Sequence, residues 1–223
     1  MALILQLNYN YCILKSLIKT YYSSFRHPQG LIGRYAVYRM NGKRHGVLAE
    51  WALEGLLLPS EPSVADIGCG GGANVARLLD KFPESKVTGV DISPIAVNKA
   101  RKVNKDAIAS GRCKILGGNA KMLPLLKESH DLITAFETVY YWPSFNECVA
   151  EIHRVLKPGG KVLIANETDG IDPEGLKWPK LVGHMHIFTI EELVEYLTEA
   201  GFTDIHSRHD EERHFICVTA TKP

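Results

Sequence analysis

The sequence predicts an α/β fold with a doubly wound, mainly parallel β-sheet, and three observations support this prediction. From residue 63 onward, short apolar runs alternate with segments whose apolar residues recur every three or four positions. The first apolar run, 64–67, leads into a glycine-rich turn at 68–72 and then into a helical pattern, which is how a βα unit begins. Near the end of the chain, two strand-like segments flank the polar residues 210–213, which predicts an antiparallel hairpin at one edge of the sheet.

A helical segment over residues 1–58 is expected to precede the sheet-forming domain at 59–223. Apolar residues recur at helical spacing within 3–25, 31–40 and 47–56, and short breaks rich in proline, glycine or asparagine separate these stretches. The segment packs on the domain or on a second copy of the chain, or it covers the active site as a lid. The sequence leaves these alternatives open.

Strands and helices alternate through the rest of the chain. Strands are expected at 63–67, 86–90, 112–117, 130–136 and 160–166, followed by hairpin strands at 203–208 and 214–221. Helices are expected at 73–82, 94–109 and 144–156, and a last helix begins after Thr189 and ends near Gly201. Ser93 is the expected N-cap of the second helix, and Thr189 and Glu192 are expected to form a capping box. Such βαβ connections place helices on both faces of the sheet.

The glycine turn alone does not identify a ligand. Gly68, Gly70 and Ala73 also fit the dinucleotide-binding pattern G-x-G-x-x-G/A. Asp66, immediately before the turn, would repel a pyrophosphate and would favour a cationic group such as an ammonium. Asp91 ends the next strand, and its carboxylate can accept hydrogen bonds from both hydroxyls of a ribose. A ligand with a ribose, a cationic amino-acid end and no phosphate is S-adenosylmethionine.

Three motifs in this order resemble those of class I S-adenosylmethionine-dependent methyltransferases. They lie at Asp66–Gly72, Gly89–Ser93 and Leu156–Leu163, and the resemblance covers about residues 60–220. It implies the Rossmann-like methyltransferase fold, which is a seven-stranded, mainly parallel sheet with a C-terminal antiparallel hairpin. It also implies methyl transfer from S-adenosyl-L-methionine to a small or medium-sized acceptor, with S-adenosyl-L-homocysteine as the product.

The resemblance and the strand ends together predict the cofactor-binding residues. They are Asp66, Gly68, Cys69, Gly70, Asp91, Ile92, Asn119, Ala120 and Glu137. Ile92 is expected to pack on the adenine, while the Asn119 amide oxygen and the Ala120 N–H would bond to its edge. Asn119 as a plain turn residue and Cys69 as a small packed residue are the structural alternatives.

Catalytic and acceptor-binding residues are expected around the end of the fourth strand and in the long loop 166–188. The catalytic candidates are Glu137, Tyr140 and His184. The substrate-pocket candidates are Tyr35, Arg39, Asn41, His45, Tyr141, Trp142 and His186. Glu137 could instead cap the next helix, and the aromatic rings could attract a sulfonium or belong to the core. His184 and His186 share one face of an extended segment, but no matching ligand cluster follows, so no metal is expected.

Composition and charge reduce the number of partner classes that the sequence allows. A formal net charge of +1 gives no global field that would attract nucleic acid, and the end of the fourth strand lacks an Asn-Pro-Pro-Tyr type motif. No apolar run reaches the roughly 18 residues that span a membrane, and the N-terminus lacks a basic region typical of a secretory signal. The five cysteines are scattered, which favours a reducing, cytoplasmic setting. We expect a monomer or a homodimer.

Two other functions remain open at this point. The glycine pattern and Asp91 permit an NAD(P)-dependent oxidoreductase, although Asp66 and the lack of a Tyr-x-x-x-Lys pair speak against it. A non-catalytic S-adenosylmethionine-binding protein that acts through its N-terminal helices is the other alternative.

Overall fold

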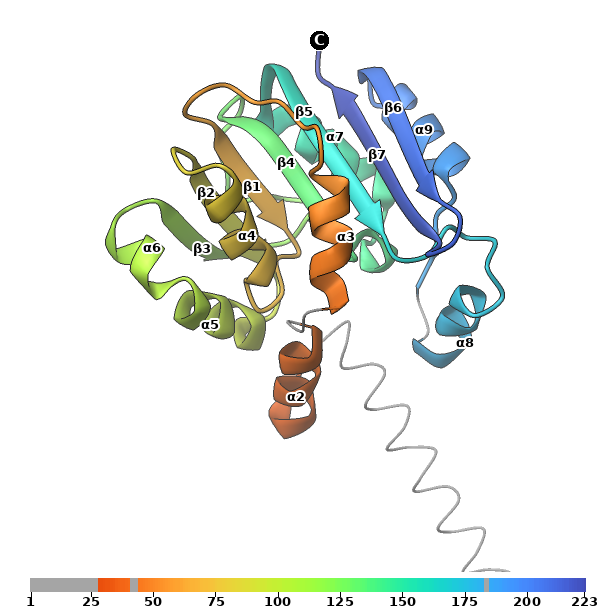
Figure 1. Cartoon of the computed structure of the whole chain (residues 1–223), viewed down its shortest axis with the longest axis horizontal. Coiled ribbons are helices and arrows are strands. Elements are labelled where there is room, and N and C mark those ends of the chain that lie inside the picture. Colours follow the sequence, from red (N-terminus) through yellow and green to blue (C-terminus); the bar gives the residue numbers. More distant parts are fainter. Residues whose placement is uncertain (1–27, 41–43, 183–184) are drawn as a thin grey trace, which may run out of the picture.

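A seven-stranded sheet with helices on both faces forms the body of the molecule (Figure 1). The computed structural model describes residues 28–40, 44–182 and 185–223. The strands are β1 (Ser63–Ile67), β2 (Lys86–Asp91), β3 (Cys113–Gly117), β4 (His130–Phe136), β5 (Leu156–Asn166), β6 (Thr203–Asp210) and β7 (Phe215–Thr221). They lie in the order β3-β2-β1-β4-β5-β7-β6, in which β7 is antiparallel to both β5 and β6 and the other neighbouring strands are parallel. The expected fold class is confirmed.

The helices cover the sheet in two layers, with α3, α4 and α5 on one face and α7 and α9 on the other (Figure 1). The helices are α2 (Gly30–Met40), α3 (Arg44–Ala52), α4 (Ala73–Lys81), α5 (Pro94–Val103), α6 (Lys105–Ala109), α7 (Phe145–Val155), α8 (Trp178–Val182) and α9 (Ile190–Glu199). Two 3₁₀ turns, η1 (Val139–Tyr141) and η2 (Gly175–Lys177), complete the described elements. In the part of the chain that the structure describes, no helix is long and apolar enough to cross a bilayer.

Both faces of β5 are buried, which explains its continuous apolar run. Val162 and Ile164 face the layer of α7 and α9, while Leu163 and Ala165 face the layer of α3 and α4. A central parallel strand covered on both sides is expected to be apolar throughout. The sheet is therefore held by two apolar layers, and its strand ends are free to carry polar residues.

The expected helix starts are confirmed. Ser93 Oγ accepts a hydrogen bond from the Ala96 N–H at 3.4 Å, and Pro94 opens α5. Thr189 Oγ1 accepts from the Glu192 N–H at 3.3 Å, and Glu192 Oε2 accepts from the Thr189 N–H at 2.9 Å. These bonds satisfy N–H groups that have no partner within the helix.

Three element boundaries differ from the sequence prediction. The expected helix 94–109 is interrupted at Asn104, whose Nδ2 donates to the Gly72 and Ala100 carbonyls at 3.0 Å each. Asn104 thereby joins the end of α5 to the glycine turn. The strand expected at 160–166 begins earlier, because Leu156 already pairs with His130. The loop expected at 166–188 contains η2 and α8. The helix expected at 3–25 lies outside the described residues.

Candidate active site

A cavity opens at the carboxyl ends of β1, β2 and β4, beside the glycine turn that follows β1. Parallel α/β sheets bind their ligands at this edge. The predicted residues that line the cavity are Gly68, Gly70, Asp91, Ile92, Asn119, Ala120, Glu137, Tyr141 and Trp142. The structure thus brings most of the expected cofactor residues together with two of the expected aromatic rings.

Two glycines, Gly68 and Gly70, give the turn its shape. Their φ angles are +74° and +52°, a backbone region that other residues rarely adopt. A Cβ atom at Gly68 would lie 2.0 Å from Thr138 Oγ1, because the ends of β1 and β4 approach closely there. A Cβ at Gly70 would meet no atom within 4 Å, and this residue lines the cavity. A ligand can therefore lie against bare backbone at Gly70.

Asp91 fixes the conformation of the turn. Its Oδ2 atom accepts a hydrogen bond from the Gly70 N–H at 2.8 Å, and its Oδ1 atom accepts one from the Ser93 N–H at 2.8 Å. Burial raises the pKa of the Asp91 carboxyl group above its ordinary value, although both N–H donors oppose this shift. Each carboxylate oxygen can accept a second hydrogen bond. Acceptor sites therefore remain for the ribose hydroxyls expected at this strand end.

Asp66 lies behind the glycine turn and is absent from the described residues that line the cavity. It is only 2% exposed, and its Oδ1 atom accepts a hydrogen bond from Thr134 Oγ1 at 2.8 Å. Burial raises the pKa of this carboxyl group to about 7, and the charge of Asp91 adds to the shift, while the Thr134 bond opposes it. The direct contact with an ammonium that the sequence suggested stays a prediction, since Asp66 is not among the residues that line the cavity.

The Cys69 side chain belongs to the core. It packs in the apolar layer with Val75, is 7% exposed and does not line the cavity. Its backbone N–H donates to the Val90 carbonyl at 3.1 Å. Burial raises the pKa of the thiol well above its ordinary value, which makes it a poor nucleophile. Cys69 is the small packed residue that the sequence offered as an alternative to a cofactor ligand.

Asn119 lines the cavity but also closes a turn. Its Oδ1 atom accepts a hydrogen bond from the Lys121 N–H at 3.0 Å, and its backbone pairs with Met122. Asn119 therefore has the turn role that the sequence left open. A second lone pair on Oδ1 is still available for the expected adenine contact.

Glu137, at the end of β4, joins the cavity wall to the loop after β5. Its Oε1 atom accepts hydrogen bonds from the Tyr140 hydroxyl at 2.8 Å and from the Glu167 N–H. Its φ of +56° is unusual for a residue with a side chain, and such strain is found where surrounding contacts impose it. Glu137 does not cap the next helical turn, since Thr138 holds that position.

Tyr140 lies beneath the cavity rather than in its wall. It is 3% exposed, and burial together with the neighbouring Glu137 raises the pKa of its hydroxyl well above the ordinary value. Tyr140 therefore stays protonated and donates to Glu137. Tyr141 and Trp142 do line the cavity, so of the three adjacent aromatic residues only Tyr140 is absent from its wall.

His186 and Tyr35 are not brought to the cavity. The His186 Nε2 atom lies 3.1 Å from Glu192 Oε1, and the ring meets Phe188 edge-on with centroids 4.4 Å apart. Tyr35 is 52% exposed on α2 and does not line the cavity. His184 and Asn41 lie outside the described residues, as do the side chains of Arg39 and His45.

Sequence reasoning missed several residues of the cavity wall. Pro28 and Val37 contribute from the N-terminal segment, and Thr138 contributes from the end of β4. Val37 is 3% exposed and belongs to the apolar stripe of its helix. That stripe was visible in the sequence, but nothing in it indicated that part of the stripe would border a ligand cavity.

Comparison with known proteins finds similarity to methyltransferases. Residues 65–164 match the family model described as a methyltransferase domain. An O-methyltransferase of Pyrenophora dematioidea is 30% identical over 143 residues, which cover 62% of this chain and 53% of that protein. The chain spans about half the length, or less, of the curated relatives it matches first.

Two solved structures share the fold. A SAM-dependent methyltransferase from Aquifex aeolicus has a TM-score of 0.70 at 18% identity, with 85% of this chain and 98% of that chain covered. Phosphoethanolamine N-methyltransferase 2 of Haemonchus contortus, solved with phosphomonomethylethanolamine and S-adenosylhomocysteine, has a TM-score of 0.70 at 15% identity. That match covers 85% of this chain and 57% of the other.

The nicotinamide-dependent alternative finds no support in these comparisons. The matched residues 65–164 contain the glycine turn, Asp91 and the end of β4, where the expected cofactor residues lie. The comparisons accordingly support a class I S-adenosylmethionine-dependent methyltransferase, through the match of residues 65–164 to a methyltransferase domain.

Proposed function

We propose that this protein transfers the methyl group of S-adenosylmethionine to a small or medium-sized acceptor. The observation that carries the proposal is a cavity whose wall combines the bare backbone of Gly70 with Asp91, Tyr141 and Trp142. No Lys or Arg occurs among the described wall residues. This lining suits a cationic nucleoside without phosphate groups.

The residues of the cavity fit this cofactor in three ways. Asp91 would accept hydrogen bonds from the ribose, Ile92 and Ala120 would flank the adenine, and the turn at Gly68 and Gly70 would hold the amino-acid part. When bound, S-adenosylmethionine supplies a methyl group on a positively charged sulfur, which makes the sulfur a good leaving group. The protein has to align the acceptor with that methyl group and keep water out.

Tyr141 and Trp142 would keep water out of the reacting centre. Aromatic faces attract cations, and large rings exclude water from a reacting centre. Glu137 would act as a positioning residue, because its Oε1 atom holds both Tyr140 and the backbone of Glu167. We retain His184 as a predicted catalytic residue and residues 1–58 as a predicted helical segment that either packs on the domain or covers the cavity.

The proposal names a class of acceptor rather than one compound. One relative is named as an O-methyltransferase and one structural neighbour as an N-methyltransferase, so the acceptor atom varies within this fold. We further propose a cytoplasmic location and a monomeric or homodimeric state. The four described cysteines are buried and free, which is compatible with a reducing compartment.

Calorimetry tests the cofactor assignment. We expect S-adenosylmethionine and S-adenosylhomocysteine to bind one equivalent each, and NAD⁺ to bind at least about a hundredfold more weakly. Binding of NAD⁺ with no heat from the other two ligands would refute the proposal.

A labelled cofactor separates an enzyme from a binding protein. S-adenosylmethionine with a radioactive methyl group, incubated with the protein and a deproteinised small-molecule extract, should give a labelled product that an Asp91→Ala variant does not form. Tight cofactor binding without any labelled product, across extracts and pH values, would favour the non-catalytic alternative.

A further inference from the structure

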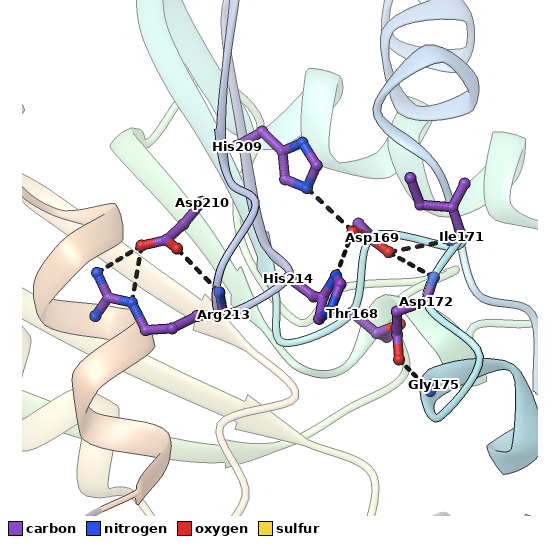
Figure 2. Close-up of polar contacts among 9 residues, drawn as sticks. All are labelled: Thr168, Asp169, Ile171, Asp172, Gly175, His209, Asp210, Arg213 and His214. Carbon is purple, nitrogen blue, oxygen red and sulfur yellow. Dashed lines mark hydrogen bonds and ion pairs between the residues drawn. The ribbon is translucent and has the colours of Figure 1, made fainter.

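Two aspartates and two histidines meet where the loop after β5 reaches the β6–β7 hairpin (Figure 2). Asp169 and Asp172 come from the loop, His209 from β6 and His214 from the turn before β7. None of the four lines the cavity described above. The cluster is therefore a separate feature of the molecule, assembled from segments about 40 residues apart in the sequence.

One carboxylate oxygen lies at the centre of the cluster. Asp169 Oδ2 is 2.8 Å from His214 Nδ1 and 3.0 Å from His209 Nε2. One ligand atom each from Asp169, Asp172 and His214 lies within 4.8 Å of the other two. Neighbouring ligands of a tetrahedral zinc ion, with bonds of about 2.0–2.1 Å, lie about 3.3 Å apart. Small side-chain movements would bring these three atoms to that spacing, whereas the His209 ring lies outside this group and would have to move further to serve as a fourth ligand.

The two carboxylates are buried, and the basic side chains that contact them are histidines. Asp169 is 5% exposed and Asp172 is 7% exposed. Among the described residues, neither forms an ion pair with a Lys or Arg, and the nearby Arg213 pairs with Asp210 instead (Figure 2). Buried charges are normally paired or bound to metal ions. Two buried negative charges faced by two imidazole rings therefore form a site that a divalent cation would neutralise.

Hydrogen bonds from the surrounding loop hold both carboxylates in place. Asp169 Oδ1 accepts from the N–H groups of Ile171 and Asp172, at 3.0 Å each. Asp172 accepts from Thr168 Oγ1 at 2.6 Å and from the Gly175 N–H at 2.5 Å. A carboxylate oxygen has two acceptor positions, so these bonds leave lone pairs free. Carboxylates that bind metal ions are commonly supported in this way.

Gly175 permits this arrangement. A Cβ atom at this position would lie 2.1 Å from Thr168 Oγ1 and 2.2 Å from Asp172 Oδ2. The backbone therefore approaches the Asp172 carboxylate more closely than any residue with a side chain would allow. The loop conformation that directs Asp172 toward the cluster depends on glycine here.

We propose that Asp169, Asp172, His209 and His214 form a binding site for a divalent transition-metal ion, with Zn²⁺ as the ion that suits them best. Two imidazole nitrogens and two carboxylate oxygens are ligands that zinc accepts, and four protein ligands are typical of a structural site. The ion would bind Nδ1 of His214 and Nε2 of His209. Each neutral ring would then carry its proton on the other nitrogen.

The ion would fasten the loop after β5 to the C-terminal hairpin. Glu167 lies two residues before Asp169, and its N–H donates to the cavity residue Glu137. Metal binding would thus stabilise the part of the loop that borders the proposed methyl-transfer site, while the ion itself stays outside that site.

Cobalt and zinc titrations of the untagged, full-length protein test the proposal. After treatment with a chelator, the wild-type protein should bind one equivalent of Co²⁺ with visible absorption typical of low coordination, and Zn²⁺ should displace it. His214→Asn should weaken binding at least tenfold. Asparagine suits this position because the φ of His214 is +56°, a region that Asn tolerates.

His186→Asn is the matched control. His186 also contacts a carboxylate, at 3.1 Å from Glu192, but it is exposed and belongs to no group of three possible metal ligands among the described residues. This variant should bind the metal ion like the wild-type protein. Asp172→Asn, with its fold checked by circular dichroism, serves as the second variant if His214→Asn does not fold.

Two results would overturn the metal site. One is a wild-type protein that binds neither Co²⁺ nor Zn²⁺ in the micromolar range. The other is equal binding by the wild-type and His214→Asn proteins. In either case the cluster is a hydrogen-bonded contact between histidines and aspartates. Neither result bears on cofactor binding, which is measured separately.

Discussion

The Tyr140 hydroxyl donates a hydrogen bond to Glu137 Oε1 at 2.8 Å, and the same oxygen accepts the N–H of Glu167. Three segments, the end of β4, the turn η1 and the loop after β5, are therefore held by one carboxylate oxygen. Glu137 also lines the cavity, so its position depends on contacts that lie outside the cavity. This arrangement indicates that Glu137 positions other groups. A general base would instead have to accept a proton during the reaction.

Substitution of Glu137 separates the two roles. Glu137→Gln keeps an oxygen that can accept both hydrogen bonds, so we expect methyl transfer to fall by less than about tenfold. Glu137→Ala leaves the Tyr140 hydroxyl and the Glu167 N–H without their acceptor, and should lower the free energy of unfolding by about 1–3 kcal/mol. Urea denaturation and steady-state kinetics measure both effects. If Glu137 were a general base, Glu137→Gln would lose activity about as severely as Glu137→Ala, by roughly 100-fold or more.

Asp91 should control cofactor affinity. Its carboxylate orders the glycine turn through the Gly70 N–H, and it is the proposed acceptor of the ribose hydroxyls. Loss of charge-assisted hydrogen bonds costs about 1.5–3 kcal/mol, so Asp91→Ala should raise the Kd for S-adenosylhomocysteine by roughly 10- to 150-fold. Asp106→Asn, on the separate short helix α6, provides a control that should bind like the wild-type protein. Unchanged affinity in Asp91→Ala, measured by calorimetry, would remove Asp91 from the site.

Two glycines at strand ends should respond differently to alanine. A Cβ at Gly68 would lie 2.0 Å from Thr138 Oγ1, and the φ of +74° adds strain, so Gly68→Ala should reduce stability by more than about 2 kcal/mol. A Cβ at Gly117, at the end of β3, meets no atom within 4 Å. Gly117→Ala should therefore change stability by less than about 1 kcal/mol. Thermal unfolding monitored by circular dichroism compares the two, and equal losses would contradict the close approach at Gly68.

The sheet and its ligand edge could be predicted from the sequence because they depend on local patterns. Alternating apolar runs give β1 to β5, and the glycine turn with Asp91 follows from residues only a few positions apart. The hairpin strands also follow from local polar and apolar alternation. These features are encoded in short stretches and do not require knowledge of distant contacts.

Features that depend on distant contacts could not be predicted in this way. Asn104 interrupts its helix because it reaches the Gly72 carbonyl, 32 residues earlier. The direction of the Asp66 side chain is set by Thr134 on a neighbouring strand, and the contact of His186 with Glu192 depends on the path of the preceding loop. The cluster of Asp169 with His209 and His214 joins residues at least 40 positions apart, and no local spacing indicates it.

Asp66 should make the stability of the ligand-free protein depend on pH. Burial raises the pKa of its carboxyl group to about 7, whereas an aspartate in the unfolded chain titrates near 3.8. Between these values the folded state holds a proton that the unfolded state releases, so this group lowers stability as pH rises from about 4 to about 7. The loss approaches about 1.4 kcal/mol per pH unit and totals roughly 4 kcal/mol.

Asp66→Asn should remove this dependence, because its amide oxygen can still accept the hydrogen bond from Thr134 Oγ1 and carries no charge at any pH. The difference in unfolding free energy between the variant and the wild-type protein should therefore shift in favour of the variant from pH 5 to pH 7, and stay constant above about pH 7.5. Urea denaturation at half-unit pH intervals measures this difference, and other titrating groups cancel because they are common to both proteins. A difference that is flat from pH 5 to pH 8 would mean that Asp66 is already ionised in the fold. Its position behind the glycine turn would then have to be solvated, and it could take part in cofactor binding after all.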